Sequence, residues 1–405
     1  MVRKIDLNHF QVARSETARD INARIMLNLV RKLQPISRAS LARQSGLQRS
    51  TVSAITEQLI ADNWLREGDT GHLPRGRKPK FLHLNEERGG IIGINVRPSY
   101  THVALANLAG RFLVQDSMPT PASAGEFVDQ ISERIRQLKN ERPDMAYEGI
   151  GVSLPGRVDP RTNRFVFAPN LGWHEEDLKH RLESSTGLSV DLENEANACA
   201  LSEYWFGRHP EGAGNVIVIA VSEGIGTGII LNGQLVRGST GLAGEFGHVT
   251  LSEDGPMCSC GNRGCWEVFA SNQAAVRYYA EGAATNKNGK HKSAAARANF
   301  RFEDILTLAE QGDLAAVEAI DRMAHYLGLG VAMLVTGLAP DSIVVVGEVT
   351  RAWDRVGTIV TETAKQHSFT QANTRIVASG PALLPRLRGI VALVLQKHFG
   401  APAIA

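Results

Sequence analysis

The sequence predicts an α/β protein that begins with a winged helix-turn-helix and continues as a larger body of alternating strands and helices with a zinc-binding loop. Three observations predict this. A basic N-terminal segment contains a helix, a glycine turn and a second helix in close succession. Strand-like and helix-like segments alternate through most of the remaining chain of 405 residues. Three of the four cysteines lie between positions 258 and 265, shortly after a histidine.

Composition is that of a folded protein, with 43% hydrophobic and 21% charged residues. No apolar run reaches transmembrane length and the first twenty residues are charged throughout, so we expect a cytoplasmic protein without membrane contact. The formal net charge of +2 hides an asymmetry, because residues 1–85 hold 15 Lys and Arg against 7 Asp and Glu. This basic segment suits contact with DNA phosphates, although a solvated basic face would carry the same charge.

A helix-turn-helix is predicted near the start of the chain. Apolar residues recur at helical spacing over 18–33, and Pro35 ends that helix. A short helix over 37–46 closes on a glycine, and a second follows over 48–60. The first turn of the second helix carries polar residues that can enter a major groove, and these are the predicted base contacts: Gln48, Arg49, Ser50, Thr51 and Ser53.

Two short strands after Trp64 flank a basic tip rich in glycine and proline, which is typical of a wing. Arg75 and Arg77, with Lys78 beside them, are predicted to contact phosphates or a narrow minor groove. The alternative is a helical bundle with a mobile basic loop. Turn, helix polarity, wing and charge agree with one another and favour DNA binding.

The body beyond Asn85 shows two runs of strands, each followed by helical segments, which predicts two lobes with a cleft between them. Strands are predicted over 91–96, 101–108, 149–153, 215–220, 228–231 and 234–236, with a helix over 127–139. Gly224, Gly226 and Gly228 do not form a dinucleotide fingerprint, because a hairpin follows them where that motif needs a helix. We expect them to form a tight turn that lets the backbone approach a ligand.

His248, Cys258, Cys260 and Cys265 are the predicted metal ligands. One imidazole and three thiolates suit a closed tetrahedral Zn²⁺ site, and four protein ligands leave no position for a hydrolytic water. We therefore expect one structural zinc per chain. Three reduced thiols without metal are the alternative.

The motif Gly244-Glu245-Phe-Gly-His248, followed by Cys258-x-Cys260-Gly-x-x-Gly264-Cys265-x-Glu267, resembles the signature of the ROK family (repressors, open reading frames, kinases). The resemblance extends from about residue 89 to the end, and the winged helix in front matches the repressor branch. It implies an actin-like (ribonuclease H-like) sugar-kinase-type fold. The implied domains are a winged helix of 1–88, a first lobe of 89–196 with 387–405, and a second lobe of 197–386 that carries the zinc and the dimerisation surface.

The same resemblance implies a set of sugar ligands. They are Gly156, Arg157, Asn170, Asn194, Glu195, Glu245, His248 and Glu267. Carboxylates and amides suit sugars because each can engage two hydroxyl groups. His248 would place one ring nitrogen on zinc and the other near a sugar hydroxyl. Each carboxylate taken alone could equally be a solvated surface residue.

Three departures from the kinase pattern imply that no catalytic residue remains. The phosphate loop Asp-x-Gly-Gly-Thr is replaced by the stretch Asn95–Tyr100, in which Pro98 also lacks an amide donor. Glu223 puts a carboxylate where phosphate charge would lie, and Glu348 stands where the kinases have a second glycine beside the nucleotide. Glu195 stands where the kinases have a catalytic aspartate, and its longer side chain would misplace a general base.

We therefore expect a sugar-responsive repressor of carbohydrate-utilisation genes, acting as a homodimer or a dimer of dimers on a pseudo-palindromic operator. One alternative is an ATP-dependent sugar kinase with a fused DNA-binding segment. Another is a repressor controlled by a protein partner or by a sugar phosphate, for which Arg157 offers a guanidinium.

Overall fold

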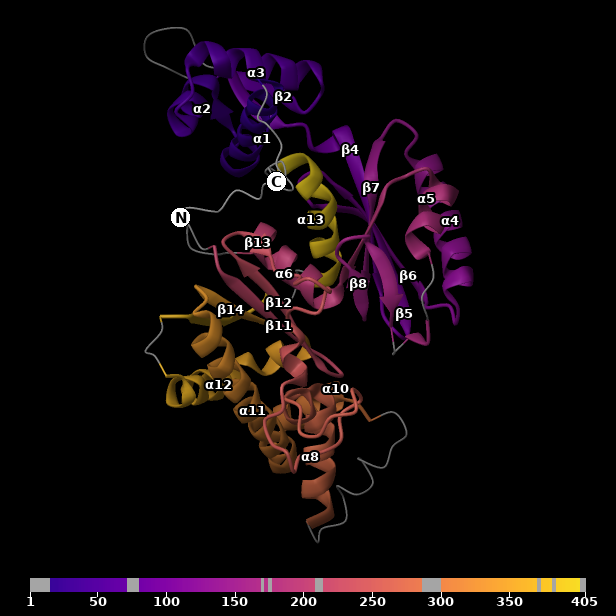
Figure 1. Ribbon diagram of the computed structural model, residues 1–405, viewed down its shortest axis with the longest axis vertical. Coiled ribbons are helices and arrows are strands. Elements are labelled where there is room, and N and C mark those ends of the chain that lie inside the picture. Colours follow the sequence, from indigo (N-terminus) through magenta and orange to yellow (C-terminus); the bar gives the residue numbers. More distant parts are fainter. Residues whose placement is uncertain are drawn as a thin grey trace. The chain divides into compact units, whose positions relative to one another are not determined.

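The computed structural model of the chain (Figure 1) describes residues 15–70, 80–168, 171–173, 177–207, 214–285, 300–369, 373–380 and 384–400. The chain divides into two compact units. The first contains Met1–Val152, Asp177–Asp191 and Val391–Ala405, and the second contains Ser153–Glu176 and Leu192–Ile390. The finer division into a winged helix and two lobes stays a prediction.

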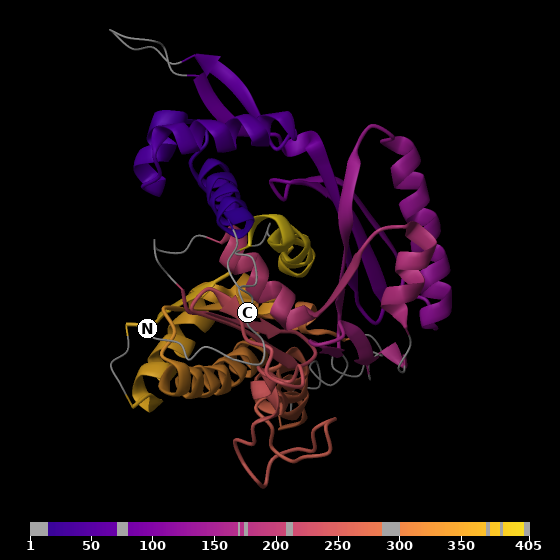
Figure 2. The same ribbon diagram turned by 45° about the horizontal axis from the view of Figure 1, so that its top comes forward.

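The N-terminal segment of the first unit has the predicted helix-turn-helix. It consists of α1 (Ser15–Leu33), α2 (Arg38–Ser45) and α3 (Arg49–Ala61), and a sheet of β1 (Ile36–Ser37), β3 (Lys80–Leu84) and β2 (Leu65–Thr70). Ser37 caps α2 through its hydroxyl, and Gly46 ends α2 in the left-handed conformation at φ 72°. Figure 2 shows the β2–β3 hairpin extending beyond the three helices.

A small apolar core fixes these helices against one another. Its fully buried members come from all three helices and from the sheet: Met26, Val30, Leu41, Val52, Leu82 and Leu84. The stripe of α3 that faces this core leaves the beginning of the same helix directed to solvent.

The larger part of the first unit is a five-stranded sheet in the order β10-β7-β4-β5-β6. The strands are β4 (Gly89–Val96), β5 (Tyr100–Asn107), β6 (Phe112–Pro119), β7 (Ala146–Leu154) and β10 (Val190–Asn194). Helices α4 (Ala124–Glu141) and α5 (Leu178–Thr186) lie along one face and α13 (Pro385–Phe399) along the other (Figure 1). Every residue of β4 is buried because both faces of the sheet are covered.

The second unit has a mixed five-stranded sheet in the order β13-β12-β11-β14-β15. The strands are β11 (Val216–Val221), β12 (Ile225–Leu231), β13 (Gln234–Leu235), β14 (Ser342–Val346) and β15 (Arg375–Ala378). Strands β11, β14 and β15 are mutually parallel, and β12 runs antiparallel to both of its neighbours, β11 and β13. Ser222 and Glu348 follow the carboxyl ends of β11 and β14, the edge where open α/β sheets bind ligands.

Helices cover both faces of this second sheet. Alternate residues of β11, such as Ile217 and Ile219, pack into a core with α8 (Asn272–Thr285), α10 (Phe302–Glu310), α11 (Leu314–Leu338) and α12 (Trp353–His367). Helix α6 (Glu195–Phe206) packs against β12. No helix in the described part of the chain is long and apolar enough to cross a membrane.

Candidate DNA-binding face and metal and ligand site

The predicted base contacts lie at the beginning of α3. Gln48, Arg49 and Ser50 are exposed, and Thr51 and Ser53 are half-buried. Gln48 is the N-cap residue and makes no side-chain capping bond, so its amide is available to a partner. The predicted wing contacts lie outside the described residues: Arg75, Arg77 and Lys78.

Polar contacts hold α3 to its neighbours. Arg38 of α2 donates to Thr56 Oγ1 of α3 at 3.1 Å and pairs with Glu67 of β2 at 2.9 Å. Lys80 of β3 pairs with the other oxygen of Glu67 at 2.5 Å. Lys80 and Arg38 together hold the pKa of Glu67 below its ordinary value. The helix that presents the polar face is thus tied to both α2 and the hairpin.

The four predicted metal ligands come together in the second unit, with their ligand atoms all within 4.8 Å of one another. His248 ends the short helix η3 (Glu245–His248), and the cysteines lie on the loop that follows. His248 Nδ1 lies 3.6 Å from Cys258 Sγ, and Cys260 Sγ lies 3.6 Å from Cys265 Sγ. The sequence prediction that these residues converge is confirmed, and the cluster can hold a metal ion.

The donor set and its spacing fit zinc. A tetrahedron with Zn–S of about 2.3 Å and Zn–N of about 2.0 Å has ligand–ligand edges of about 3.5–3.8 Å. The two distances of 3.6 Å lie within that range. The amide of Cys260 also donates to Cys258 Sγ at 3.5 Å. Burial raises the pKa of the Cys258 thiol, with the neighbouring Glu267 adding to the shift, so a cation would stabilise the thiolate that this carboxylate disfavours.

The backbone of the cysteine loop is fixed by tight turns. Gly264 has φ 64°, and a Cβ there would lie 1.6 Å from Ser252 O, so only glycine fits. Trp266 comes directly after Cys265 and is fully buried. Its indole Nε1 donates to Tyr326 O at 2.9 Å, and a Cβ on Gly330 would lie 1.9 Å from its ring. The loop is therefore anchored to α11.

Two predicted sugar ligands lie against this cluster. Glu267 begins α7 (Glu267–Ala270), and its Oε1 is 2.9 Å from Cys258 Sγ and 3.5 Å from His248 Nδ1. Glu245 Oε2 is 3.7 Å from the other ring nitrogen of His248, Nε2. Burial raises the pKa of Glu245, although half of its side chain is exposed. The two nitrogens of His248 thus face different groups: Nδ1 lies near Cys258 and Glu267, and Nε2 lies near Glu245.

Two other predicted sugar ligands, Asn194 and Glu195, lie at the beginning of α6. Asn194 is the N-cap of this helix, and its Oδ1 accepts from the amides of Ala196 and Asn197. Its Nδ2 donates to Gly156 O at 2.9 Å, which joins α6 to the turn before β8 (Arg157–Asp159). Arg157 Nε donates to Thr240 O at 3.0 Å. Asn170 lies outside the described residues.

Glu193 is a buried residue that we did not predict as part of the site. Its Oε1 accepts from the backbone amide of Asn194 and from Asn197 Nδ2, both at 3.0 Å. Its Oε2 accepts from Arg237 Nε at 2.9 Å, and only 5% of its side chain is exposed. Glu193 therefore holds the asparagines that begin α6. The only sequence signal was an acidic residue at the end of a buried strand.

Strand β12 connects the metal cluster to α6. Glu267 Oε2 accepts from the amide of Ile225 at 3.4 Å. Directly afterwards, a Cβ on Gly226 would lie 2.8 Å from Ala196 Cβ, and one on Gly228 would lie 2.2 Å from Ala196 O. Gly226 and Gly228 thus lie within a strand and let α6 approach it. For these two glycines the expected place in a turn is wrong, because helix packing is what requires the missing side chains. Gly224 does lie in the turn between β11 and β12, where a Cβ would lie 2.5 Å from Glu267 Oε2.

Glu195 is paired with a residue that the sequence did not single out. Arg386 Nε donates to Glu195 Oε2 at 2.6 Å, with 12% and 25% of the two side chains exposed. Arg386 lies in the first turn of α13, nearly 200 positions away in the sequence. A lone arginine after a proline carries no motif signal, and only the fold brings it to Glu195.

Two of the stretches that we expect to depart from the kinase pattern make local contacts. After β4, Arg97 donates from its backbone amide to Tyr100 O at 3.0 Å and from Nη1 to the Tyr100 hydroxyl at 2.8 Å. Thr120 Oγ1 donates to Arg97 O at 2.6 Å. After β14, Glu348 begins the short helix η4 (Glu348–Ala352) and accepts from Asn272 Nδ2 at 3.1 Å.

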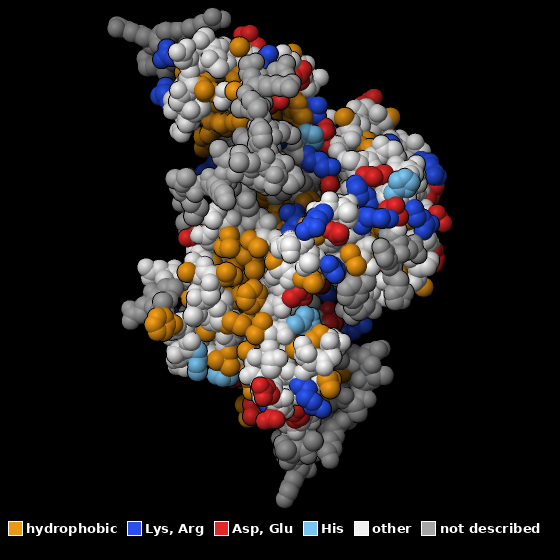
Figure 3. All heavy atoms as spheres, viewed as in Figure 1, with side chains coloured by type: hydrophobic (Ala, Val, Ile, Leu, Met, Phe, Trp, Pro, Cys, Tyr) orange, Lys and Arg blue, Asp and Glu red, His pale blue; other side chains and the backbone are white. Residues whose placement is uncertain are grey.

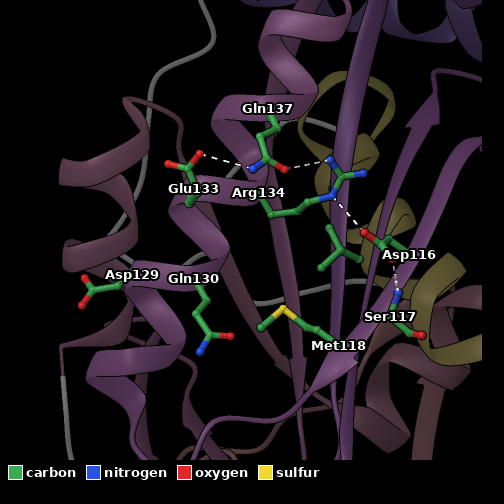
Figure 4. A pocket seen from close by; sticks show the side chains of 9 residues that line it. Asp116, Ser117, Met118, Asp129, Gln130, Glu133, Arg134 and Gln137 are labelled. Carbon is green, nitrogen blue, oxygen red and sulfur yellow. Dashed lines mark hydrogen bonds and ion pairs between the residues drawn. The ribbon is translucent and has the colours of Figure 1, made fainter.

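A pocket of about 520 Å³ lies elsewhere, between α4 and strands β5 and β6 of the first unit (Figure 4). It is lined by Val103, Asp116, Ser117, Met118, Asp129, Gln130, Glu133, Arg134 and Gln137. Arg134 Nε pairs with Asp116 Oδ2 across it at 3.0 Å. No predicted site residue lines this pocket, so it is separate from the candidate site.

Fold and site together define a class: a two-sheet α/β protein of the sugar-kinase type, with a helix-turn-helix at its N-terminus and a histidine–cysteine cluster that can hold a metal ion. The chain belongs to the ROK family, whose family model matches residues 91–397. The resemblance recognised in the sequence is confirmed.

Individual relatives agree with this placement. The xylose repressor of Bacillus subtilis (strain 168) is 32% identical over 336 residues, which is 82% of this chain and 83% of the repressor. A solved ROK family transcriptional regulator, a homologue of the Escherichia coli MLC protein, superposes with a TM-score of 0.81 at 23% identity, covering 95% of this chain and 98% of that one. A ROK family glucokinase from Streptomyces griseus, solved with glucose and AMPPNP, superposes with a TM-score of 0.66 at 30% identity, covering 75% of this chain and 99% of the glucokinase. The predicted fold class is confirmed.

Proposed function

We propose that this protein is a sugar-responsive transcriptional repressor of carbohydrate-utilisation genes. One observation carries the proposal: carboxylates that suit sugar hydroxyls gather around the histidine–cysteine cluster in a chain that begins with a helix-turn-helix. The similarity to a xylose repressor over 82% of the chain supports the same function. A cytoplasmic location stays a prediction in keeping with it.

The N-terminal segment would bind the operator. The exposed first turn of α3, with Gln48 and Arg49, would read base edges, and the wing arginines would contact phosphates or the minor groove. Over α4 and α5 of the body, basic and acidic side chains are mixed on the face shown in Figure 3. Residues 1–85, in contrast, hold 15 Lys and Arg against 7 Asp and Glu, an excess that suits DNA. A homodimer or dimer of dimers on a pseudo-palindromic operator follows from this mode of binding.

The sugar would bind beside the metal cluster. His248 Nδ1 and the three cysteine sulfurs would hold one zinc per chain, which when bound supplies a structural link rather than a reactive water. Glu245, Glu267 and His248 Nε2 would then present acceptors and a donor to adjacent hydroxyls. Asn194 has two acceptor bonds and one donor bond already in use, which leaves one amide hydrogen for a ligand.

Phosphoryl transfer is not part of the proposal. The turn after β4 uses the Arg97 amide in its own hydrogen bond, and Pro98 has none to offer, so few donors remain for a phosphate. Glu195 is held by Arg386 and is not free to act as a base. Glu348 adds negative charge at the edge where a nucleotide would lie.

Calorimetric titration tests the function with a sugar panel of D-xylose, D-glucose and N-acetyl-D-glucosamine. The operator is first selected from a random DNA duplex library by the wild-type chain. We expect one sugar to bind and to change operator affinity by about 5–150-fold, with operator changing sugar affinity by the same factor. Glu245→Gln should lose the sugar response and keep sugar-free operator binding. Equal sugar affinity with and without operator would exclude a sugar-controlled repressor.

A sugar kinase with a DNA-binding segment is the second candidate, favoured by the similarity to the Streptomyces griseus glucokinase. An ATP-consumption assay with the same panel separates the two. Turnover above that of a Glu195→Gln variant would favour the kinase. An operator response to a sugar phosphate, with none to free sugar, would instead indicate a phosphorylated effector held by Arg157.

A further inference from the structure

Helix α13 passes from one compact unit of the chain into the other. It runs from Pro385 to Phe399 without interruption, and the boundary between the units falls between Ile390 and Val391. The first turn of α13 therefore belongs to the unit with the candidate ligand site. Its last turn belongs to the unit with the helix-turn-helix. A single helix is stiff over this length, so a displacement at one end is felt at the other.

At its first turns, α13 is held to α6. Arg386 Nε donates to Glu195 Oε2 at 2.6 Å. One turn later, a Cβ on Gly389 would lie 1.6 Å from Ala198 O, so the two helix backbones are in direct contact. Arg386 Nη2 is buried and makes no hydrogen bond within the described residues. The guanidinium thus depends on Glu195 for its principal bond.

The charge of Arg386 is stabilised by its pair with Glu195. Burial alone would lower the pKa of Arg386, but the charge of Glu195 raises it above its ordinary value. With 12% of the Arg386 side chain exposed, water replaces little of this interaction. A ligand that competes for Glu195 would therefore weaken the contact that holds the first turn of α13.

At its last turn, α13 is held to the helix-turn-helix segment. Arg24 Nη1 of α1 donates to Gly400 O at 2.9 Å, and Asn28 Nδ2 donates to Phe399 O at 2.5 Å. Trp64 follows α3 in the sequence and directly precedes β2, and its ring centroid lies 5.0 Å from that of His398 and 6.2 Å from that of Phe399. The orientation of α1 is therefore tied to the end of α13.

We propose that Arg386 is the positioning residue that couples the ligand site to the DNA-binding segment through α13. The inference rests on the proposed function. In the sugar-free form the Arg386–Glu195 ion pair holds α6 and the beginning of α13 together. A sugar that engages Glu195 with its hydroxyls competes with Arg386 for this carboxylate and weakens the ion pair. The resulting shift of α13 reaches α1 through Phe399 and Gly400.

The first test needs neither sugar nor DNA. The whole chain is labelled with 5-fluorotryptophan, and the ¹⁹F resonance of Trp64 is assigned with Trp64→Phe. We expect Arg386→Ala to shift the Trp64 resonance, and Arg386→Lys to shift it less because it keeps the charge. Arg388→Gln is the matched control, since Arg388 lies two residues further along α13, over the Phe206 ring at 5.6 Å. A folded Arg386→Ala chain with an unchanged Trp64 resonance would overturn the coupling.

The second test separates this inference from the function on which it rests. Sugar and operator affinities are measured for the wild type, for Arg386→Ala and for the double variant Arg24→Ala/Asn28→Ala. We expect the double variant to bind the panel sugar as the wild type does, while the effect of that sugar on operator affinity falls to less than about twofold. Arg386→Ala should show the sugar-bound operator affinity before any sugar is added.

The outcomes are distinct. A sugar response that stays at the wild-type factor in both variants would overturn the role of Arg386 and α13 and leave a sugar-responsive repressor in place. A wild type that binds operator but none of the panel sugars removes the sugar effector from the proposed function. In that case the Trp64 resonance of Arg386→Ala and its sugar-free operator affinity still decide the inference. If Arg386→Ala fails to fold, Arg386→Lys and the double variant decide it, since neither leaves the partly buried Glu195 carboxylate without a cation.

Discussion

Glu267 Oε1 lies 2.9 Å from Cys258 Sγ, so a carboxylate predicted to bind sugar touches a sulfur predicted to bind zinc. The other oxygen of Glu267 accepts from Ile225 at the beginning of β12. The metal cluster and the ligand site are therefore parts of one structure. Groups that lie beside a metal site in this way orient its ligands.

The metal prediction follows directly. The purified chain should contain about one zinc, and Cys258→Ser or Cys265→Ser should lose it, since each removes one of four ligands. Glu267→Gln should keep the four ligands but lower the affinity for zinc by about 10–100-fold, as for other groups that hydrogen-bond to metal ligands. Elemental analysis and competition with a chelator measure both effects.

Cys199→Ala serves as the control for the metal prediction. Cys199 is equally buried but lies on α6 and is not part of the cluster, so this variant should keep its zinc. A metal-free wild type with three freely reactive thiols and normal sugar binding would contradict both the site and its support of Glu267.

Gly330→Ala should destabilise the second unit. Its new methyl group would lie 1.9 Å from the Trp266 ring, and Trp266 anchors the cysteine loop. We expect a loss of about 1–3 kcal/mol, as for other overpacked cores, together with weaker zinc binding. Gly337→Ala, in the same helix with open space around it, should instead gain up to about 1 kcal/mol from helix propensity. Chemical denaturation measures both, and equal effects would show that Trp266 does not fix the loop.

Gln48→Ala should change base preference at the operator, because the Gln48 side chain is exposed at the beginning of α3. A loss of about 1–3 kcal/mol at the affected base pair is expected. Gln58→Ala is the control, since Gln58 lies on the same helix and is bonded to Asp62 instead. The double variant Arg75→Ala/Arg77→Ala should weaken binding to all operator sequences alike, and it should flatten the dependence of this binding on salt concentration. Binding to a panel of operator variants at several salt concentrations distinguishes these effects.

Acid should weaken the contact between α13 and the N-terminal segment. Glu148 lies 3.1 Å from His398 Nε2 and pairs with Arg88, whose guanidinium stacks on Trp64 at 3.8 Å. The contact with His398, then the charge of Arg88, lowers the pKa of Glu148 below its ordinary 4.5. The ionised carboxylate therefore stabilises the fold above about pH 4.5, and this contribution is lost as pH falls through the lowered pKa.

Glu148→Gln should accordingly be less stable than the wild type at pH 7, by about 1–3 kcal/mol. The two chains should converge as the pH falls below 4.5. Denaturation across pH 3–7 measures the difference. A difference that stays constant over this range would mean that the charge of Glu148 contributes nothing.

The sequence by itself determined the local features of this protein. Gly46 and the polar turn from Gln48 predict the helix-turn-helix because capping and exposure are local properties. The spacing from His248 to Cys265 predicts the metal cluster because ligands on one tight loop converge whatever the rest of the fold does. The alternation of strands and helices predicted an α/β body, and the motif from Gly244 to Glu267 was long enough to mark the family and its fold.

Only the tertiary structure decided the long-range partners. Arg386 meets Glu195, Arg237 meets Glu193, and Gly228 meets Ala196, each from a different element of the chain. No local pattern marks these residues, because a salt bridge or a close helix approach depends on where separate elements are placed. Burial then makes such pairs consequential, since a charge taken out of water requires its partner. The residues that could join ligand binding to DNA binding are of this second kind.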